Sequence, residues 1–475
     1  MLESIFCVPL FTGLIALFLP IKLGRIVLVV SGLLHLQMTL LAWLTSFTPL
    51  LPGYFGSAPS GMLVLVVTSF IFLCIAPYSV FYMREQEMQS EPIFIGCMLL
   101  FLATMSMAAL AEHPIVFWIA VEATTLVSAP LIFINRSKKA LEATWKYVLI
   151  CSVGIALALL GFFFITLSME QADLDVPLTF SSLNSAARQL DPSWLKTGFI
   201  FVLIGFGTKM GLAPMHTWLP DAHSEAPSPA SALLSGALLN CAFLGIYKVH
   251  TLMVLAGLGD FSGSLLIGFG LFSILVAGIF ILNQSDYKRM LAYSSIENMG
   301  VIAFGVGIGG LGLYGAMLHL IHHSLLKSSL FLSAGNLVLG FGTKLVARCG
   351  GMVSLLPRTF VSFFAGFVGI SGLPPFGIFL SELMILLGAF QTGHPLAAGL
   401  FIATLVLVLA GFARIVTAMS FSPRQEEVLV EEQTLRIIPP LALLLTSALL
   451  CVWMPEPLFR TIVNTIAVIG GTIHG

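Results

Sequence analysis

The sequence contains few charged residues, and this scarcity excludes most classes of soluble protein. Only 9% of its 475 residues are Asp, Glu, Lys or Arg, whereas a soluble protein of this size carries about 25%. The net charge of −1 and the lack of a basic patch give no indication of a nucleic-acid partner. In contrast, 58% of the residues are hydrophobic, and the mean hydropathy is +1.03. We therefore predict an all-α, multi-pass integral membrane protein in contact with the lipid bilayer.

Cysteine motifs are also missing. The seven cysteines are scattered, and none forms a Cys-x-x-Cys pair or lies at the spacing of an iron–sulfur or zinc site. We interpret them as small apolar residues and expect neither a metal nor a redox cofactor in this chain. The first twenty residues lack a basic leader and a small-residue cleavage site, so we expect a retained helix and not a signal peptide.

Apolar runs recur almost without pause along the chain. Each is long enough to cross a hydrocarbon core of ~30 Å at ~1.5 Å per residue. The sequence therefore predicts about fourteen transmembrane helices. Their expected ranges are 3–20, 24–45, 61–83, 92–111, 114–134, 144–168, 196–217, 228–251, 262–283, 291–310, 312–340, 358–388, 396–420 and 435–454.

The basic residues of the connections support this number of spans. Connections after odd-numbered spans hold fourteen Lys or Arg residues, and connections after even-numbered spans hold only Arg188 and Lys196. Because basic connections stay in the cytoplasm, we expect both termini on the outer face of the cell's inner membrane. The fourteen residues are Lys22, Arg25, Arg84, Arg136, Lys138, Lys139, Lys146, Lys288, Arg289, Lys344, Arg348, Arg358, Arg424 and Arg436.

Proline interrupts two of the predicted spans in similar settings. The first contains "GTKMGLAPMHTW" (span 196–217) and the second "GISGLPPFGIFLSELM" (span 358–388). They lie five spans apart, and an odd offset inverts the repeated unit in the membrane. Broken helices at matching positions of inverted repeats often mark a transport site. We therefore predict four regions: three N-terminal spans (1–91), two inverted five-helix repeats (92–251 and 252–420), and the last span with a C-terminal tail (421–475).

Four ionisable residues lie near the middle of predicted spans or beside the breaks: Glu122, Lys209, Lys327 and Glu382. A charge at the bilayer centre costs on the order of 3 kcal/mol, so such residues are kept when they have partners or a task. Each alone is compatible with a structural role, as an ion pair or, for Lys327, as a side chain that reaches an interface. Together they alternate acid, base, base, acid, and each broken helix carries one. This arrangement favours a proton relay, because burial disfavours the charged form of each group and an opposite charge restores it.

Histidines accompany these residues. A single buried histidine more often satisfies a hydrogen bond than moves a proton. The proline breaks, however, leave backbone groups unpaired and leave space for water, which a continuous helix in lipid does not. The sequence thus predicts a hydrated half-channel that reaches a titratable centre, with Asp221 and Glu225 solvated at its cytoplasmic mouth. The histidines concerned are His216, His223, His319, His322 and His323.

Four motifs resemble those of the proton-conducting, antiporter-like membrane subunits. They are "TKMGLAPMHTWLPDAHSEAPSPASALLSG", "DYKRMLAYSSIENMG", "HHSLLKSSLFLSAGNL" and "GLPPFGIFLSELMIL". Such subunits occur in respiratory complex I, in Mrp-type cation/proton antiporters and in membrane-bound hydrogenases of the formate hydrogenlyase type. The "AYSSIENMG" variant and the chain length are most similar to the F component of hydrogenase 4 and its relatives.

The resemblance implies fourteen helices and a proton path through the membrane centre. It implies that Glu122 and Lys209 form an ion pair and that Glu382 is the acid of the second broken helix. It also implies that His319 and His323 belong to an axis that connects the two repeats, beside Lys327.

The eighth span departs from the family pattern. Related subunits often carry a lysine midway along it, where this sequence has Asn240. Lys248 follows eight residues later, ~12 Å further along a helix, and is no positional substitute. We therefore expect either a relay through water and Asn240 or an impaired path.

We predict a proton-translocating subunit of a membrane-bound redox complex. Its expected partners are other membrane subunits and a hydrophilic redox arm of the hydrogenase or quinone reductase type. One alternative is a subunit of a Mrp-type antiporter without redox partners, and another is a silent scaffold, which Asn240 favours. The predicted proton-path residues are Glu122, Lys209, Lys327, Glu382, His319, His323, His216, His223, Asn240 and Lys248.

Overall fold

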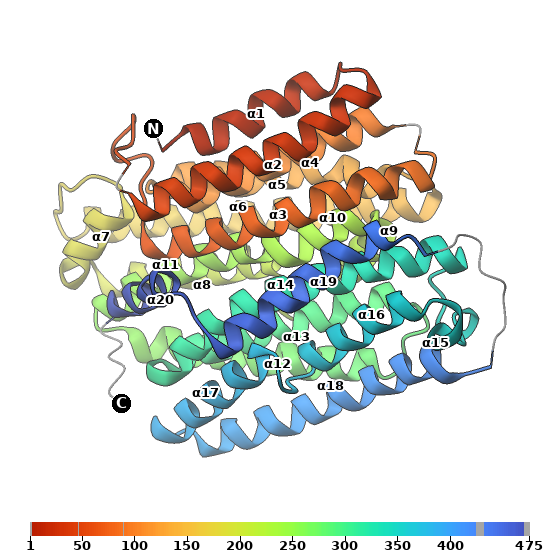
Figure 1. Cartoon of the computed structure of the whole chain (residues 1–475). Helices are drawn as coiled ribbons and strands as arrows, with labels where there is room; N and C mark the ends of the chain where they lie inside the picture. Colours follow the sequence, from red (N-terminus) through yellow and green to blue (C-terminus); the bar gives the residue numbers. More distant parts are fainter. Residues whose placement is uncertain (1, 46, 89, 424–431, 470–475) are drawn as a thin grey trace.

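The computed structural model describes residues 2–45, 47–88, 90–423 and 432–469, and these residues form a bundle of helices that lie side by side (Figure 1). No β-strand occurs in this part of the chain. The long uninterrupted helices are α2 (Ile21–Leu44), α3 (Pro59–Glu85), α4 (Glu91–Leu110), α5 (Pro114–Phe133), α6 (Lys138–Glu170), α12 (Gly259–Ile281), α13 (Tyr287–Ile308), α14 (Gly310–Phe341), α18 (Pro395–Phe421) and α19 (Thr434–Val452).

The remaining helices are shorter or are parts of interrupted membrane segments. One membrane segment is continuous but changes its winding, and short helices lie in the connections and near the C-terminus. They are α1 (Ser4–Ala16), α7 (Phe180–Ala186), η1 (Ala187–Gln189), α8 (Pro192–Met210), α9 (Trp218–Glu225), α10 (Ser228–Leu233), the π-helical turn η2 (Leu234–Leu238), α11 (Leu239–Leu255), η3 (Val346–Arg348), α15 (Met352–Leu355), α16 (Pro357–Ile370), α17 (Gly377–Gln391) and α20 (Glu456–Ala467).

The predicted number of spans agrees with this architecture. Within the described residues, eleven helical stretches are long and apolar enough to cross a membrane, and α1 and the two interrupted pairs α8/α9 and α16/α17 complete the fourteen expected segments. The all-α fold class is therefore confirmed. The first helix is shorter than the expected range 3–20, because the chain turns after Ala16 and Pro20 caps the start of α2.

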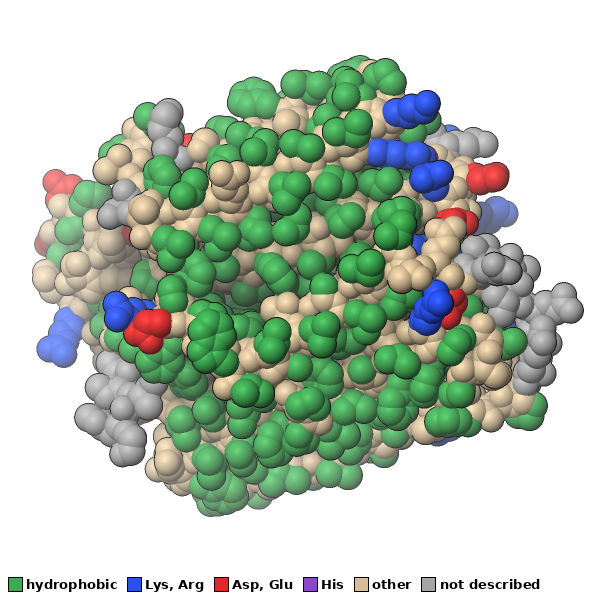
Figure 2. Space-filling model, viewed as in Figure 1, with side chains coloured by type: hydrophobic (Ala, Val, Ile, Leu, Met, Phe, Trp, Pro, Cys, Tyr) green, Lys and Arg blue, Asp and Glu red, His purple; other side chains and the backbone are tan. Residues whose placement is uncertain are grey.

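The surface of the bundle is divided into an apolar band and two charged ends. Figure 2 shows hydrophobic side chains over the middle of the helices, with Lys, Arg, Asp and Glu gathered toward the two ends of the bundle. Apolar side chains that are exposed on this band meet lipid or partner subunits at no desolvation cost. The protein is thus a multi-pass integral membrane protein. Arg424, one of the basic residues used to predict the orientation, lies outside the described residues.

Both proline-interrupted segments are built alike. α8 stops at Gly211, which adopts φ +85, and the chain resumes as α9; α16 is followed by Gly372 at φ +68 and then by α17. Glycine suits these positions because it adopts the left-handed conformation without a Cβ clash. Each break also contains a cis X-Pro peptide bond, Ala213–Pro214 and Pro374–Pro375. The predicted breaks are confirmed, whereas the division of the chain into four regions stays a prediction.

Glycine allows close helix contacts in each half. α6 packs on α8, and α12 packs on α13. A Cβ atom at Gly161 would lie 2.8 Å from the carbonyl oxygen of Gly198, and one at Gly270 would lie 2.7 Å from that of Gly300. Small residues let backbones approach in this way in membrane bundles. These contacts fix α8 and α13, which carry buried charged residues described below.

Short helices also lie outside the predicted spans. α7 and η1 fall in the connection 169–193, and α20 follows the last span. The Tyr247 hydroxyl donates to the carbonyl oxygen of Thr465 (2.7 Å), and Trp43 Nε1 donates to the Thr461 hydroxyl (2.8 Å). α20 is therefore fixed across the end of the bundle at which α1 begins (Figure 1).

Candidate functional site

Lys209 lies in the last turn of α8, immediately before the first break, and its side chain is fully buried. Its ammonium donates hydrogen bonds to the Thr125 hydroxyl of α5 (2.7 Å) and to the Tyr147 hydroxyl of α6 (2.8 Å). Trp218, at the start of α9, packs against the Tyr147 ring, with the two ring centroids 4.9 Å apart. Helix α8, before the break, and helix α9, after it, therefore both help to position this ammonium.

Glu122 lies one turn before Thr125 on α5 and is half-buried. Its carboxylate accepts from the Thr125 hydroxyl (3.2 Å) and from the Ser152 hydroxyl of α6 (2.7 Å). The direct Glu122–Lys209 ion pair implied by the family resemblance is not formed in this conformation: within the described residues, Thr125 stands between the two charges. A hydroxyl that donates to the acid and accepts from the base suits a proton relay.

Lys327 lies near the middle of α14 and is also fully buried. Its ammonium donates to the carbonyl oxygen of Leu291 (2.6 Å) and to the Ser294 hydroxyl (2.8 Å), both on α13. The alternative that this lysine reaches toward a membrane interface is therefore wrong, because its charged end remains inside the bundle.

His319 lies on α14 about two turns before Lys327, and its side chain connects α13 to α17. Its Nε2 lies 3.0 Å from the Asn298 amide oxygen, and its Nδ1 lies 2.9 Å from the Ser381 hydroxyl. The Asn298 amide nitrogen donates to the adjacent Glu297 carboxylate, whose side chain is buried with 2% exposure. A continuous set of polar groups thus runs from α13 to the residue before Glu382.

The second break surrounds Glu382, which is half-buried. A Cβ atom at Gly372 would overlap a carboxylate oxygen of Glu382, and one at Gly377 would overlap Nε2 of His322. The two glycines therefore leave the space that these side chains occupy. The Nδ1 atom of His322 lies 2.9 Å from the Ser447 hydroxyl of α19.

Asn240 joins the two halves. Its amide nitrogen donates to the Ser324 hydroxyl of α14 (2.7 Å), three residues before Lys327, and to the carbonyl oxygen of Gly236 (3.0 Å). Gly236 belongs to the π-helical turn η2, a type of helix irregularity that is frequent at functional sites. The buried polar side chains from Glu122 through Lys209 and Lys327 to Glu382 are called the polar row below. Asn240 belongs to this row and is not an isolated replacement for a lysine.

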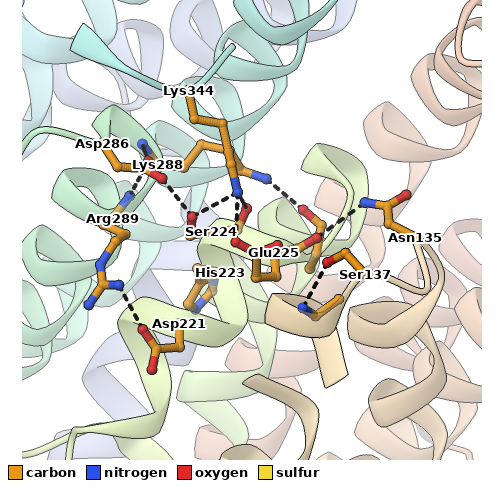
Figure 3. Close-up of polar contacts among 12 residues, drawn as sticks. Asn135, Ser137, Asp221, His223, Ser224, Glu225, Asp286, Lys288, Arg289 and Lys344 are labelled. Carbon is orange, nitrogen blue, oxygen red and sulfur yellow. Dashed lines mark hydrogen bonds and ion pairs between the residues drawn. The ribbon is translucent and has the colours of Figure 1, made fainter. Parts of the chain in front are cut away.

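A charged cavity of about 820 Å³ opens at one end of the bundle, between the two halves. Asp221 accepts from Arg289 (2.9 Å), and Glu225 pairs with Lys344 (2.9 Å) (Figure 3). Asp221 also accepts from Lys146 (3.0 Å). Asp221 and Glu225 therefore line the predicted mouth, but as members of ion pairs. Residues of both halves line this cavity, among them Asn135 and Lys146 of the first half and Asp286 and Lys344 of the second.

The predicted histidines occupy different places. His223 is fully buried below this cavity, stacks on Phe331 with ring centroids 5.2 Å apart, and has no hydrogen-bond partner on either ring nitrogen. His323 is buried in α14 with both ring nitrogens equally unpartnered. His216 lies in the first break beside Phe280 and Tyr293. Buried polar groups usually have partners, so His223 and His323 differ from His319, whose two ring nitrogens both lie within hydrogen-bond distance of a side chain.

Lys248 is separate from this row. It lies two turns beyond Asn240 and donates to the carbonyl oxygen of Ala111 (2.8 Å), with its ammonium 4.3 Å from the Phe180 ring centroid. It borders a cavity of about 140 Å³ that Glu112 also lines. The structure thus places Lys248 toward the end of the bundle opposite the charged cavity.

Sequence reasoning missed several polar members of the row. Glu297 is the most important, because the cost of an acid inside a span applies to it as it does to Glu122. It stands in the quoted motif "AYSSIENMG", within the expected span 291–310. The neutral members Thr125, Tyr147 and Ser294 gave no comparable signal, since hydroxyl groups are common in buried helices and only the fold shows which of them meet a lysine.

The fold and this row define an antiporter-like membrane protein. Residues 111–408 match the family described as "NADH:quinone oxidoreductase/Mrp antiporter, TM", and the chain belongs to this family.

Curated relatives and solved structures agree. The chain is 39% identical over 323 residues to the hydrogenase-4 component F homolog of Methylacidiphilum infernorum, covering 67% of this chain and 68% of that protein. It is 32% identical to hydrogenase-4 component B of Escherichia coli, over 78% of this chain and 58% of that protein. The fold resembles a chain of respiratory complex I from Thermus thermophilus, with a TM-score of 0.85, 23% identity, and coverage of 99% and 100% of the two chains.

Proposed function

We propose that this chain translocates protons as a membrane subunit of a multi-subunit redox complex of the hydrogenase-4 or complex I type. The observation that carries the proposal is a row of polar side chains through the bundle interior, made of one hydrogen-bonded set around Lys209 and a second around Lys327 and His319. Asn240 lies between the two sets in the row and is hydrogen-bonded to the helix that carries Lys327. In order, its members are Glu122, Thr125, Lys209, Asn240, Ser324, Lys327, Ser294, Asn298, His319, Ser381 and Glu382.

The row has both acids and bases and borders places for water. Protons move along such a row when each group alternates between protonated and deprotonated states. The charged cavity supplies protons from one end, past His223, and the cavity beside Lys248 offers a release route at the other end. Glu122 and Lys209 respond to the redox reaction of the partner subunits by changing their separation, because the free energy of each charge depends on the other.

Partner subunits are needed at both ends of the row. Glu122 lies on a face with exposed Ile119 (48%) and Leu126 (61%), and Glu382 lies between exposed Phe379 (38%) and Leu383 (39%). A half-buried carboxylate facing hydrocarbon costs on the order of 3 kcal/mol. Membrane subunits that cover these two faces remove the cost and extend the row, and a hydrophilic redox arm drives it.

The orientation follows from the basic residues. The charged cavity has Lys139, Lys146, Lys288, Arg289 and Lys344 in its lining. Since basic connections face the cytoplasm, this end is proposed to be cytoplasmic, with both termini outside the inner membrane.

The test is proton uptake by sealed vesicles that contain the purified complex, measured together with its electron-transfer rate. Glu122→Gln is expected to lower the protons moved per electron about tenfold, because a neutral amide cannot hold or release the proton. If Glu122→Ala lowers the amount of assembled complex, and the complex that does assemble still pumps normally, Glu122 has only a structural role. Vesicles that exchange sodium for protons at the native rate without any redox reaction would instead identify a Mrp-type antiporter.

A further inference from the structure

Among the residues that the structure describes, Glu297 has no ion pair, and this separates it from a buried carboxylate with a structural partner such as Glu91. Glu91, which is buried with 4% exposure, accepts two hydrogen bonds from Arg25, at 2.6 and 2.8 Å. Glu297 is buried with 2% exposure, and its carboxylate accepts a hydrogen bond from the amide nitrogen of Asn298. A buried carboxylate without an ion pair is expensive, so a structural role does not explain why Glu297 is an acid.

The surroundings of Glu297 repeat the chemical layout of α5. On α5, the hydroxyl that accepts from the buried lysine belongs to Thr125, three residues from Glu122. On α13, the hydroxyl that accepts from the other buried lysine belongs to Ser294, three residues from Glu297. Residues three apart share one face of a helix. Each helix therefore presents a carboxylate and a lysine-binding hydroxyl together.

The two layouts also have the same direction across the bundle. The C-terminal end of α5 and the N-terminal end of α13 both meet the charged cavity, which Asn135 and Asp286 line. Thr125 follows its glutamate and Ser294 precedes its glutamate, so both hydroxyls lie on the cavity side of the carboxylate. Inversion of a repeat would place them on opposite sides. The shared direction is therefore not a by-product of the predicted inverted repeat.

We propose that Ser294, Glu297 and Lys327 form a second acid–hydroxyl–base unit, in which Glu297 carries the proton between Lys327 and Glu382. The Lys327 ammonium gives its proton to the Glu297 carboxylate and becomes a neutral amine. The Glu297 carboxylic acid then gives the proton to the Glu382 carboxylate, so charge and protons balance at each step. This inference rests on the proposed function and adds a carboxylate to its path.

Other ionisable groups surround this unit. Lys327 and Glu382 both interact electrostatically with Glu297. α14 also brings His319, which contacts Asn298, and His323, which interacts electrostatically with Lys327. The remaining helices that pack on α13 carry further ionisable residues: Asp221 and His223 on α9, Asp260 in the first turn of α12, and Arg414 of α18. Asp221 pairs with Arg289 of α13, and Arg414 donates to the carbonyl oxygen of Leu282. Glu297 is thus a buried carboxylate that interacts electrostatically with both Lys327 and Glu382.

The experiment compares Glu297→Gln with Glu91→Gln and Lys209→Ala in the purified complex in sealed vesicles. Gln keeps the volume of Glu and can still accept from Asn298. Glu297→Gln is expected to reduce the protons moved per electron about tenfold or more and to remove a protonated-carboxyl band from pH-difference infrared spectra. Glu91→Gln is expected to lower stability but to leave pumping by the assembled complex unchanged.

The outcomes separate the two proposals. If Lys209→Ala pumps like the native complex, the proposed function fails, whatever Glu297 does. If Lys209→Ala stops pumping while Glu297→Gln keeps the native rate and infrared bands, only the role of Glu297 is overturned. If Glu297→Gln does not assemble, Glu297→Asp decides, because a shorter acid is expected to pump with a shifted pH profile and an unchanged profile contradicts the proposal.

Discussion

The two halves of the path hold their lysines in different ways. Lys209 ends a helix beside a break, and both of its partners are side-chain hydroxyls on other helices. Lys327 lies inside the continuous helix α14, and one of its partners is a backbone carbonyl. In the second half the ionisable group beside the break is instead the acid Glu382. The difference teaches that each break lies beside one ionisable group of the row, the base Lys209 in one half and the acid Glu382 in the other, whereas Lys327 is held within a continuous helix.

The largest expected effect is that of Lys209→Ala. Removing the base beside the first break is expected to lower the protons moved per electron about a hundredfold, which is within the range of a positioned acid–base group. Dye-detected acidification of sealed vesicles measures this. Lys22→Ala, at an exposed position near the start of α2, is the control and is expected to pump normally. Native pumping by Lys209→Ala would remove the distinction between the halves.

Thr125→Val tests the hydroxyl that stands between acid and base. Valine keeps the shape but removes the donor to Glu122 and the acceptor for Lys209, and losing a hydrogen bond to a charged group costs about 1.5–3 kcal/mol. Pumping is therefore expected to fall roughly ten- to a hundredfold, and Thr125→Ser is expected to restore most of it. Equal rates for Val and Ser would show that the hydroxyl carries no proton.

Gly372→Ala has the smallest expected effect and tests the second break. Gly372 and Gly393 both adopt positive φ, at +68 and +79, but only at Gly372 would a Cβ meet Glu382, whereas nothing lies within 4 Å at Gly393. Both alanine variants are expected to lose about 1 kcal/mol of stability from the left-handed backbone. Gly372→Ala alone is expected to reduce pumping, by a few fold, because the carboxylate must move. Thermal unfolding in detergent and vesicle acidification measure the two effects, and equal pumping by both variants would contradict a role of the break.

Much of the fold could be predicted from the sequence because the bilayer imposes length and apolarity on each span. Both breaks followed from proline, and Glu122, Lys209, Lys327 and Glu382 followed from the cost of burying charge. The contacts between helices could not be predicted in this way. The hydrogen bond between Lys327 and Ser294 depends on how α13 and α14 pack. The position of Thr125 between Glu122 and Lys209 depends on how α5 and α8 pack and on the conformations of the three side chains.

Lys248 is a residue whose place in the bundle, likewise, could not be predicted from the sequence. As a charged residue in an apolar run it was grouped with the path residues, yet its position on α11 directs it to the far cavity beside Glu112. Periodicity gives its distance from Asn240 but not the helix that it faces. Its role in proton release stays a prediction.

The half-buried carboxylates at the two flanks have a consequence for how the cell makes this protein. A newly inserted copy presents Glu122 and Glu382 beside exposed apolar side chains, and it is relieved of their cost only when neighbouring subunits arrive. An orphan copy is therefore expected to be a substrate for membrane quality-control proteases, so that its abundance follows that of its assembly partners.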